Sequence, residues 1–195
     1  MNKKLLIVID CQNDFITGAL RNEEAIRKLP NVVKLIKEHD GTVIATRDTH
    51  FTKEQTKGWP MESGVAYEES LEGAMLPVTH CIKGTDGWQI ENTVEEALRE
   101  KNNQGMKKYH VIDKLTFGYK AWEHDLKFFD FDEIVICGFV SSICVLANAL
   151  ILRAIYPNMK ITVYEDCIAD ISDEGQNAAI TCLRAQQINV ETKYK

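Results

Sequence analysis

The chain contains a set of residues that could attack a carbonyl carbon, namely Asp10, Lys114 and Cys144. Cys144 lies near the predicted start of an apolar helix, where unpaired backbone N–H groups and the helix dipole favour a thiolate. The same N–H groups could stabilise the oxyanion that forms when a thiolate attacks a carbonyl. A cysteine nucleophile also needs a base and an orienting charge, which Asp10 and Lys114 could supply. The spacing also allows a plainer interpretation, in which Cys144 packs in the core, Asp10 caps a turn and Lys114 is a surface charge.

A second group of residues has the chemistry of a metal site. Asp48 and His50 are two residues apart in an extended segment, so the carboxylate and the imidazole project to the same side and can share a divalent ion. A third ligand has to come from elsewhere, and His80 is the best candidate. Glu69 or Glu72 could complete the shell, and Glu69 is assigned from its position. A solvated loop is the alternative interpretation of so short a pattern.

Apolar, β-branched runs alternate with helical patterns along the chain. Near-continuous apolar strands with helices between them favour a parallel sheet that is covered on both faces. Strands are expected at residues 5–9, 42–46, 109–112, 133–137, 160–164 and 188–192, and helices at 22–39, 94–100, 121–129, 142–155 and 174–186. The segment 49–88 is too long for a passive connection, so we expect a lid or metal-site excursion from a single domain of residues 1–195.

The candidate residues fall at the ends of the expected strands. In an open parallel sheet, ligand sites form beyond the carboxyl ends of the strands. The residues at or just beyond these ends are Asp10, Asp48, His50, Lys114, the segment 138–144, and Asp166. This rule therefore selects both groups for one edge of the sheet, and we expect the segment 166–170 to support the floor of the site.

Composition excludes several other classes of protein. The 195 residues include 23 Lys and Arg against 29 Asp and Glu, for a net charge of −6, and 45% are hydrophobic. These values are typical of a globular domain and give nucleic acid no electrostatic footprint. No apolar run approaches a membrane span, and Asp10 ends the first run before it could serve as a secretory signal. We therefore expect a cytoplasmic protein with no nucleic-acid or membrane partner.

The six cysteines fit a reducing compartment. No pair has C-x-x-C spacing, which argues against a zinc ribbon, and a chain of this size does not need disulfides. Free cysteines are mostly buried small hydrophobes, so Cys144 alone is assigned a chemical role.

Five motifs, in order along the chain, resemble those of the isochorismatase-like cysteine hydrolases and of their nicotinamidase branch. Residues 10–15, DCQNDF, are similar to the D-x-Q-N-D-F motif near the N-terminus of family members. Residues 48–50, DTH, resemble the metal pair of the nicotinamidase branch, and residues 80–87, HCIKGTDG, resemble its H-C-x-x-G-T-x-G segment. Residues 114–122 are similar to the family's lysine and aromatic stretch, and residues 138–145, GFVSSICV, are similar to its nucleophile turn.

The resemblance implies a doubly wound, Rossmann-like α/β fold, with a mostly parallel sheet between two helical layers. It implies that Asp10, Lys114 and Cys144 form a catalytic triad, which hydrolyses an amide through a thioester acyl-enzyme. It also implies that the N–H groups of Val140 and Cys144 form the oxyanion hole, and that the Phe139–Val140 peptide bond is cis.

The resemblance also implies one divalent metal ion. In nicotinamidases the metal, commonly zinc, binds the pyridine nitrogen and positions the substrate. Asp48, His50 and His80 match those ligands, and Glu69 remains an assignment from position. Zinc is therefore the expected ion, with manganese and iron as alternatives.

The expected substrate is a small amide, most simply nicotinamide, and family members usually assemble as homo-oligomers. Phe15, Phe117 and Tyr119 are the expected rings of the substrate pocket. The chain departs from the family at Pro77, because nicotinamidases usually carry a tryptophan three residues before the third metal ligand. The reaction type is therefore better supported than the substrate.

Two other interpretations account for parts of the sequence. A sibling enzyme would keep the triad and act on another small amide or on an isochorismate-type vinyl ether. A non-enzymatic receiver domain of a signalling protein needs adjacent acids after the first strand, yet Cys11 follows Asp10. The receiver interpretation also leaves Cys144 and His80 unexplained.

Overall fold

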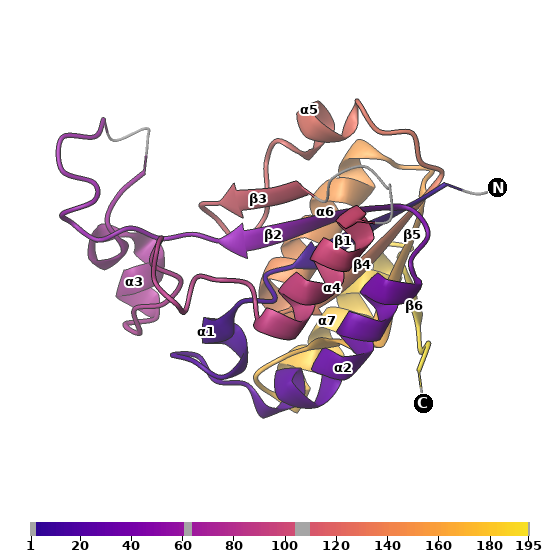
Figure 1. Ribbon diagram of the computed structural model, residues 1–195, viewed down its shortest axis with the longest axis horizontal. Helices are drawn as coiled ribbons and strands as arrows, with labels where there is room; N and C mark the ends of the chain where they lie inside the picture. Colours follow the sequence, from indigo (N-terminus) through magenta and orange to yellow (C-terminus); the bar gives the residue numbers. More distant parts are fainter. Residues whose placement is uncertain (1–2, 61–63, 104–109, 195) are drawn as a thin grey trace.

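The computed structural model describes residues 3–60, 64–103 and 110–194 (Figure 1). Helices and strands alternate along most of the chain, as the sequence predicted. The elements in chain order are β1 (Lys4–Ile9), α1 (Asn13–Ile16), α2 (Glu23–Glu38), β2 (Thr42–Asp48), η2 (Tyr67–Glu69), α3 (Leu71–Met75), α4 (Asn92–Asn103), β3 (His110–Lys114), α5 (Trp122–Leu126), β4 (Glu133–Phe139), η3 (Ser141–Val145), α6 (Leu146–Ile155), β5 (Lys160–Ala169), α7 (Asp173–Ala185) and β6 (Asn189–Glu191).

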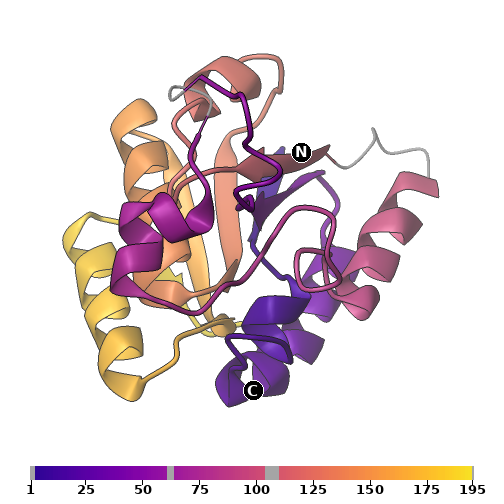
Figure 2. The same ribbon diagram turned by 90° about the vertical axis from the view of Figure 1, so that its left-hand side faces the viewer.

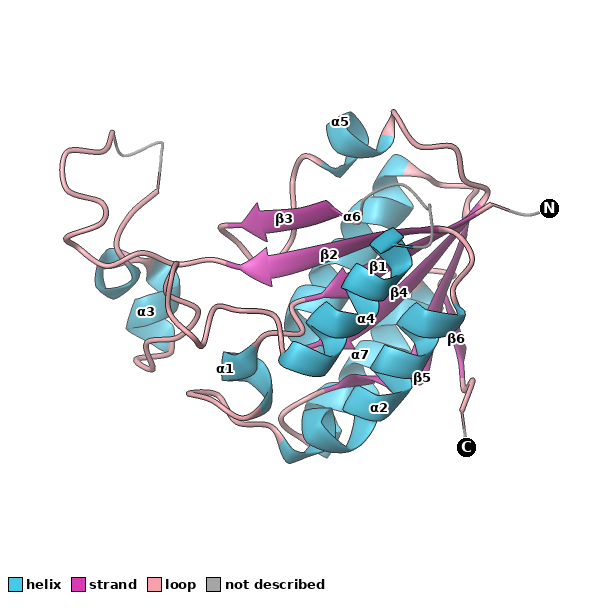
Figure 3. Cartoon of the chain, viewed as in Figure 1, coloured by secondary structure: helices cyan, strands magenta, loops and turns pink. Residues whose placement is uncertain are grey.

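The strands form one six-stranded sheet in the order β3-β2-β1-β4-β5-β6 (Figure 3). Every neighbouring pair is parallel. This order is that of a doubly wound sheet, in which the chain first builds outward from β1 to β3 and then from β4 to β6. The predicted fold class is confirmed, and the sheet is parallel throughout.

Two apolar cores flank the sheet because successive side chains of a strand face opposite sides. Leu5, Ile7 and Ile9 of β1 pack with residues of α5, α6 and α7, whereas Leu6 and Val8 pack with residues of α2 and α4. The view along the sheet shows these two helical layers on either side of the strands (Figure 2). Burial on both faces explains why β1 has a continuous apolar sequence.

Some boundaries differ from the predicted ones. β5 continues to Ala169, past its predicted end at residue 164, and Lys114 is the last residue of β3 rather than a residue beyond it. Tyr109, predicted as strand, lies outside the described residues. None of the helices in the described parts of the chain combines the length and the apolar character that crossing a membrane requires.

The segment between β2 and α4 leaves the sheet at the carboxyl ends of β2 and β3 and projects beyond them (Figure 1). It carries η2 and α3, and it returns beside β2, where His50 and Ile82 form a parallel bridge. A second bridge, between Gln12 and Ile90, ties the end of the segment to the residues that follow β1. The predicted excursion therefore lies at the functional edge of the sheet.

Candidate active site

The centre of the site is the crevice between β1 and β4, where the direction of chain winding reverses. Asp10 follows β1 with φ = 46°, and η3 follows β4. Gly138 near the end of β4 has φ = 116°, and a Cβ atom there would lie 1.9 Å from the carbonyl oxygen of Ile9. Only glycine allows the two strands to approach this closely in that conformation. The nucleophile turn can therefore lie directly beside Asp10.

Asp10, Lys114 and Cys144 meet at this crevice. Lys114 Nζ lies 2.7 Å from Asp10 Oδ2 and 3.5 Å from Cys144 Sγ. None of the three residues is more than 3% exposed. Thr46 Oγ1 donates a 2.7 Å hydrogen bond to the other oxygen of Asp10, which fixes the plane of the carboxylate. The structure thus brings the three residues singled out in the sequence into one contact group.

The ionisation of this group follows from its burial. Burial raises the pKa of the Cys144 thiol well above its ordinary value, although the charge of Lys114 opposes this. Attack by the sulfur therefore needs a base to take its proton, which is the role predicted for Asp10. Burial also raises the pKa of Asp10 against the opposing effect of Lys114, which makes the carboxylate a better base. Burial lowers the pKa of Lys114, but Asp10, Cys144 and Asp48 outweigh it, so the lysine stays protonated.

The turn that carries Cys144 is a single π-helical turn rather than the start of a regular α-helix. The Phe139–Val140 peptide bond that precedes it is cis, as the resemblance implied. Val140 is 6% exposed and immediately precedes this turn, and its carbonyl accepts hydrogen bonds from the N–H groups of Ile143 at 3.3 Å and Val145 at 3.1 Å. The role of the N–H groups of Val140 and Cys144 as oxyanion donors stays a prediction.

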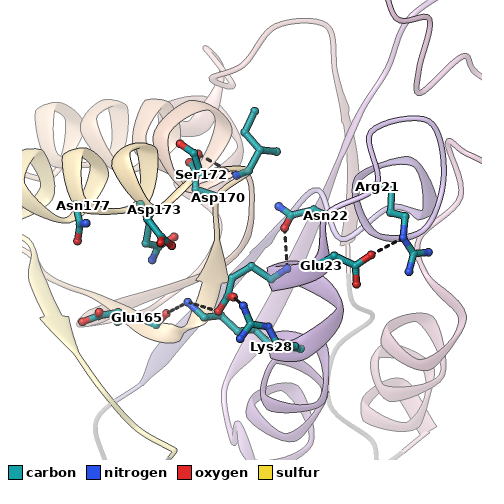
Figure 4. Close-up of a pocket in the computed structure, with 13 residues that line it drawn as sticks. Arg21, Asn22, Glu23, Lys28, Glu165, Asp170, Ser172, Asp173 and Asn177 are labelled. Carbon is teal, nitrogen blue, oxygen red and sulfur yellow. Dashed lines mark hydrogen bonds and ion pairs between the residues drawn. The ribbon is translucent and has the colours of Figure 1, made fainter.

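Asp170 and Gln176 hold the other side of the nucleophile turn. Asp170 Oδ2 accepts a 2.7 Å hydrogen bond from the N–H of Ser142, and Ser141 Oγ donates to Gln176 Oε1 at 2.8 Å. Both residues also line a cavity of about 940 Å³ between the first turns of α2 and α7 (Figure 4). Its lining comes from residues 21–28 and 165–177, so it is separate from the triad. The predicted support from residues 166–170 thus comes from Asp170, which follows β5.

The second group of residues forms a cluster at the end of β2. Asp48, His50, Glu72 and His80 each offer one ligand atom, and these atoms all lie within 4.8 Å of one another. His50 Nε2 lies 2.9 Å from Asp48 Oδ2 and 3.5 Å from Glu72 Oε1, and His80 Nε2 lies 3.4 Å from Glu72 Oε1. His80 Nδ1 donates to the carbonyl of Val78 at 2.8 Å, which leaves Nε2 as the acceptor that faces the cluster. We call these four residues the metal cluster.

Glu72 takes the place that the sequence assigned to Glu69. The Glu69 carboxylate is 56% exposed and pairs with Lys53 at 3.4 Å, away from the metal cluster. Glu72 faces inward because Ser70 caps α3, its Oγ accepting a 2.9 Å hydrogen bond from the N–H of Gly73. The fourth candidate ligand is therefore corrected from Glu69 to Glu72.

The charges of the metal cluster fit a cation. Burial raises the pKa of Asp48, but Lys114 and His50 outweigh it and hold that pKa below its usual range. Burial lowers the pKa of His50, but hydrogen bonds to Asp48 and Glu72 raise it to about 9. A protonated imidazole thus balances two carboxylates, and a divalent ion can replace that proton. Two imidazole nitrogens and two carboxylate oxygens suit zinc, iron or manganese.

Asp48 connects the metal cluster to the triad. One of its oxygens lies 3.1 Å from Lys114 Nζ, and the other lies 2.9 Å from His50 Nε2. The carboxylate is 1% exposed, so water does little to screen either contact. The two groups that the sequence suggested separately are therefore one continuous site.

Aromatic rings surround the metal cluster. The ring of Phe15 lies edge-on to His80, with 5.5 Å between centroids. Tyr67 lies edge-on to both imidazoles, 4.8 Å from His50 and 5.2 Å from His80, and its hydroxyl donates to the carbonyl of Leu76 at 2.5 Å. Phe15 was predicted from its motif, whereas Tyr67 was not predicted, because an isolated tyrosine in an irregular segment belongs to no recognisable pattern.

The other two predicted pocket residues lie differently. Tyr119 packs its ring on Trp122 at 5.1 Å, and its hydroxyl donates to Asp125 Oδ2 at 2.6 Å. Phe117 is 42% exposed. Tyr119 therefore supports the segment that carries Phe117, and of the three predicted rings Phe15 is the one that contacts the metal cluster.

Asn148 is a further residue that sequence reasoning missed. Its Oδ1 accepts hydrogen bonds from the N–H of Tyr119 at 2.9 Å and from Trp122 Nε1 at 2.8 Å. Its Nδ2 donates to the carbonyls of Phe117 at 3.0 Å and Cys144 at 2.8 Å. This fully buried side chain thus fixes the aromatic segment against the nucleophile turn. The available signal was a single amide in the first turn of α6, a helix whose other residues are all apolar except Arg153.

Comparison with known proteins identifies the family of the chain. The isochorismatase domain family matches residues 4–193. The nicotinamidase of Saccharomyces cerevisiae is 28% identical over an alignment 218 positions long, which covers 97% of this chain and 100% of the yeast protein.

Solved structures of similar proteins share the fold. The nicotinamidase/pyrazinamidase of Bacillus subtilis superposes with a TM-score of 0.77 at 22% identity, covering 97% of this chain and 99% of that one. The pyrazinamidase of Pyrococcus horikoshii, solved in complex with zinc, gives a TM-score of 0.70 at 20% identity, covering 98% and 99%. Since the family match extends over nearly the whole sequence, this chain belongs to the isochorismatase domain family, as its motifs predicted.

Proposed function

We propose that this protein is a metal-assisted cysteine amidohydrolase that converts nicotinamide and water into nicotinate and ammonia. The observation that carries the proposal is the position of Lys114, which contacts Asp10, Cys144 and the metal-cluster residue Asp48 at once. A nucleophile, a base and a substrate-positioning group would then face one small volume. The 28% identity to yeast nicotinamidase over the whole chain supports the same reaction class.

The proposed chemistry uses Asp10 as a proton carrier. Asp10 accepts the thiol proton while Cys144 Sγ attacks the amide carbon, and the N–H groups of Val140 and Cys144 stabilise the oxyanion. Asp10 then protonates the amide nitrogen, the C–N bond breaks, and ammonia leaves a thioester. In the second half, Asp10 takes a proton from water as the oxygen attacks the thioester carbon. The C–S bond then breaks, the acid leaves, and the sulfur regains its proton from Asp10.

The metal cluster would position the substrate. Asp48, His50, Glu72 and His80 would hold one divalent ion, which when bound supplies a Lewis-acid contact for a ring nitrogen of the substrate. The edge-on rings of Phe15 and Tyr67 would then border the aromatic ring of that substrate. These residues orient the amide toward Cys144, and they leave the covalent steps to the triad.

The proposal is tested by ammonia release from a panel of amides, with zinc, manganese or iron added. We expect turnover of nicotinamide and pyrazinamide, and much slower turnover of benzamide, because benzamide lacks the ring nitrogen that the ion would contact. An enzyme that releases ammonia from several amides but not from nicotinamide would contradict the assigned substrate. Equal rates on benzamide and nicotinamide would contradict the role of the metal cluster in positioning.

A second candidate is a sibling enzyme that acts on another small amide or on an isochorismate-type vinyl ether. Pro77 favours it, because this residue stands where nicotinamidases usually place a tryptophan and it is exposed. The same panel decides between the two, provided that it includes aliphatic amides and an isochorismate-type ether. The cytoplasmic location, the homo-oligomer and the single domain over residues 1–195 stay predictions.

The corrected ligand set gives a separate prediction. Changing Glu72 to Gln should reduce bound metal per chain, because the amide loses the charge that faces His50 and His80. Changing Glu69 to Gln is the matched control, since this exposed residue of the same excursion pairs with Lys53. Metal analysis after dialysis should show a loss for E72Q and wild-type content for E69Q. The reverse result would restore Glu69 as the ligand.

A further inference from the structure

Gln12 is a buried residue whose hydrogen-bonding side-chain atoms contact the two ends of the excursion. Its Oε1 accepts a 2.7 Å hydrogen bond from the N–H of Asp48. Its Nε2 donates to the carbonyl of Asp48 at 2.9 Å and to the carbonyl of Trp88 at 3.0 Å. The side chain is fully buried, so these bonds do not compete with water. Gln12 therefore joins the residue at which the excursion begins to the residue at which it ends.

The contact with Asp48 has a consequence for the metal cluster. The Asp48 carboxylate points one oxygen at Lys114 and the other at His50, so a small rotation of its backbone would spoil both contacts. Gln12 binds the N–H and the C=O of Asp48 together, which fixes the orientation of that backbone. A carboxamide is suited to this task, because it has an acceptor and a donor side by side.

Asp14 holds the returning part of the excursion in the same way. Its Oδ2 accepts a 2.7 Å hydrogen bond from the N–H of Cys81, and its Oδ1 accepts one from the N–H of Ala19 at 3.0 Å. Cys81 has φ = 48°, a left-handed conformation that a non-glycine residue seldom adopts without support. The residue before it is His80, so this hydrogen bond fixes the backbone that carries a candidate ligand.

We propose that Gln12 and Asp14 are positioning residues that set the metal affinity of the cluster, although neither belongs to it. These two residues, which lie just after β1, thereby align Asp48 at the end of β2 with His80 of the returning segment. Asp48 and His80 are far apart in the sequence. The inference rests on the proposed function only for the presence of the ion. Partners that orient metal ligands typically contribute about 10- to 100-fold to metal affinity.

The test is the affinity of the metal-free protein for zinc, measured by competition with a chromophoric chelator and without any amide substrate. Changing Gln12 to Glu keeps the acceptor and the size, but it turns an oxygen toward the carbonyls of Asp48 and Trp88. We expect Q12E to bind zinc about 10- to 100-fold more weakly than wild type. The matched control is Asn31→Asp, because the Asn31 amide also donates to a carbonyl, that of Asp166, at 3.1 Å. N31D should keep wild-type affinity.

A purely structural role for Gln12 predicts a different pattern. In that case Q12E would have a lower melting temperature than wild type without metal, and zinc would raise the melting temperature of both proteins by the same amount. That result would overturn the proposal. Equal zinc affinity of Q12E and N31D would also overturn it. If Q12E does not fold, Asp14→Asn provides the measurement, because it keeps one acceptor oxygen and should also weaken zinc binding. An enzyme that binds zinc but hydrolyses no amide would refute the proposed function and leave this inference standing.

Discussion

Changing Cys144 to Ala should abolish ammonia release, with kcat lower by roughly 10³- to 10⁶-fold, as expected when a covalent nucleophile is removed. The sulfur lies 3.5 Å from Lys114 Nζ, and burial keeps it protonated until Asp10 can take the proton. Without the sulfur no thioester can form, and water would have to attack the amide directly. Steady-state ammonia release and a search for a trapped acyl-enzyme by mass spectrometry give two independent measurements.

Cys137→Ala is the matched control for that experiment. Cys137 is also fully buried, and it lies on β4 close to the nucleophile turn, but its side chain belongs to the core on the α2 and α4 side of the sheet. The same atoms are removed there without touching Asp10 or Lys114. We expect C137A to lose some stability and to keep activity within a few fold of wild type. Activity of C144A at the level of C137A would contradict the assignment of the nucleophile.

The fold was predictable because its determinants are local and repeated. Leu5 to Ile9 are all fully buried or nearly so, and this continuous burial is what an uninterrupted apolar run reports. The rule that sites form at the carboxyl ends of parallel strands then assigned Asp10, Lys114, Cys144 and the metal pair to one edge of the sheet. Motifs in order along the chain suggested their roles. Five residues spread over the sequence could therefore be grouped before any distance was known.

The wrong predictions have a different origin, since they concern positions where no hydrophobic periodicity guides the assignment. Glu69 and Glu72 are the same residue type in the same irregular segment, so the sequence does not distinguish them. The short helix capped by Ser70 turns Glu72 inward and leaves Glu69 beside Lys53. The predicted end of β5 is too early because Glu165 and Asp166 interrupt the apolar run, although the strand continues past them to Ala169. The Asp166 side chain accepts hydrogen bonds from the N–H groups of Lys193 and Tyr194, so the charge is tolerated in a strand.

The direction in which the pKa of Cys144 is shifted could not be predicted from the sequence either, for an electrostatic reason. A helix start favours a thiolate, but that effect is small beside the cost of burying a charge. Sequence gives the position of the helix, whereas burial depends on every element that covers the site. The same limit applies to Gln12 and Asp14, whose partners are distant in sequence and are backbone groups, which no sequence pattern identifies.

Changing Lys114 to Met should both inactivate and destabilise the protein. Lys114 is 1% exposed, and its ammonium group neutralises Asp10 at 2.7 Å and Asp48 at 3.1 Å. Removing one partner of a buried ion pair leaves an uncompensated charge, which costs about 3–5 kcal/mol of unfolding free energy. The matched control is Lys37→Met, because Lys37 pairs with Glu100 at 3.1 Å and both side chains are about half exposed, 48% and 56%. An exposed pair of this kind contributes about 0–1 kcal/mol.

Urea unfolding of the metal-free proteins at two pH values distinguishes this electrostatic origin from a simple packing defect. Burial already raises the pKa of Asp10 in the presence of the lysine, so without it the carboxyl group takes up a proton at still higher pH. Protonation removes the uncompensated charge, and the stability difference between wild type and K114M should therefore shrink as the pH falls from 8 to about 5. A packing defect would give the same difference at both pH values. A K114M protein as stable as K37M would show that the lysine does not stabilise the buried carboxylates.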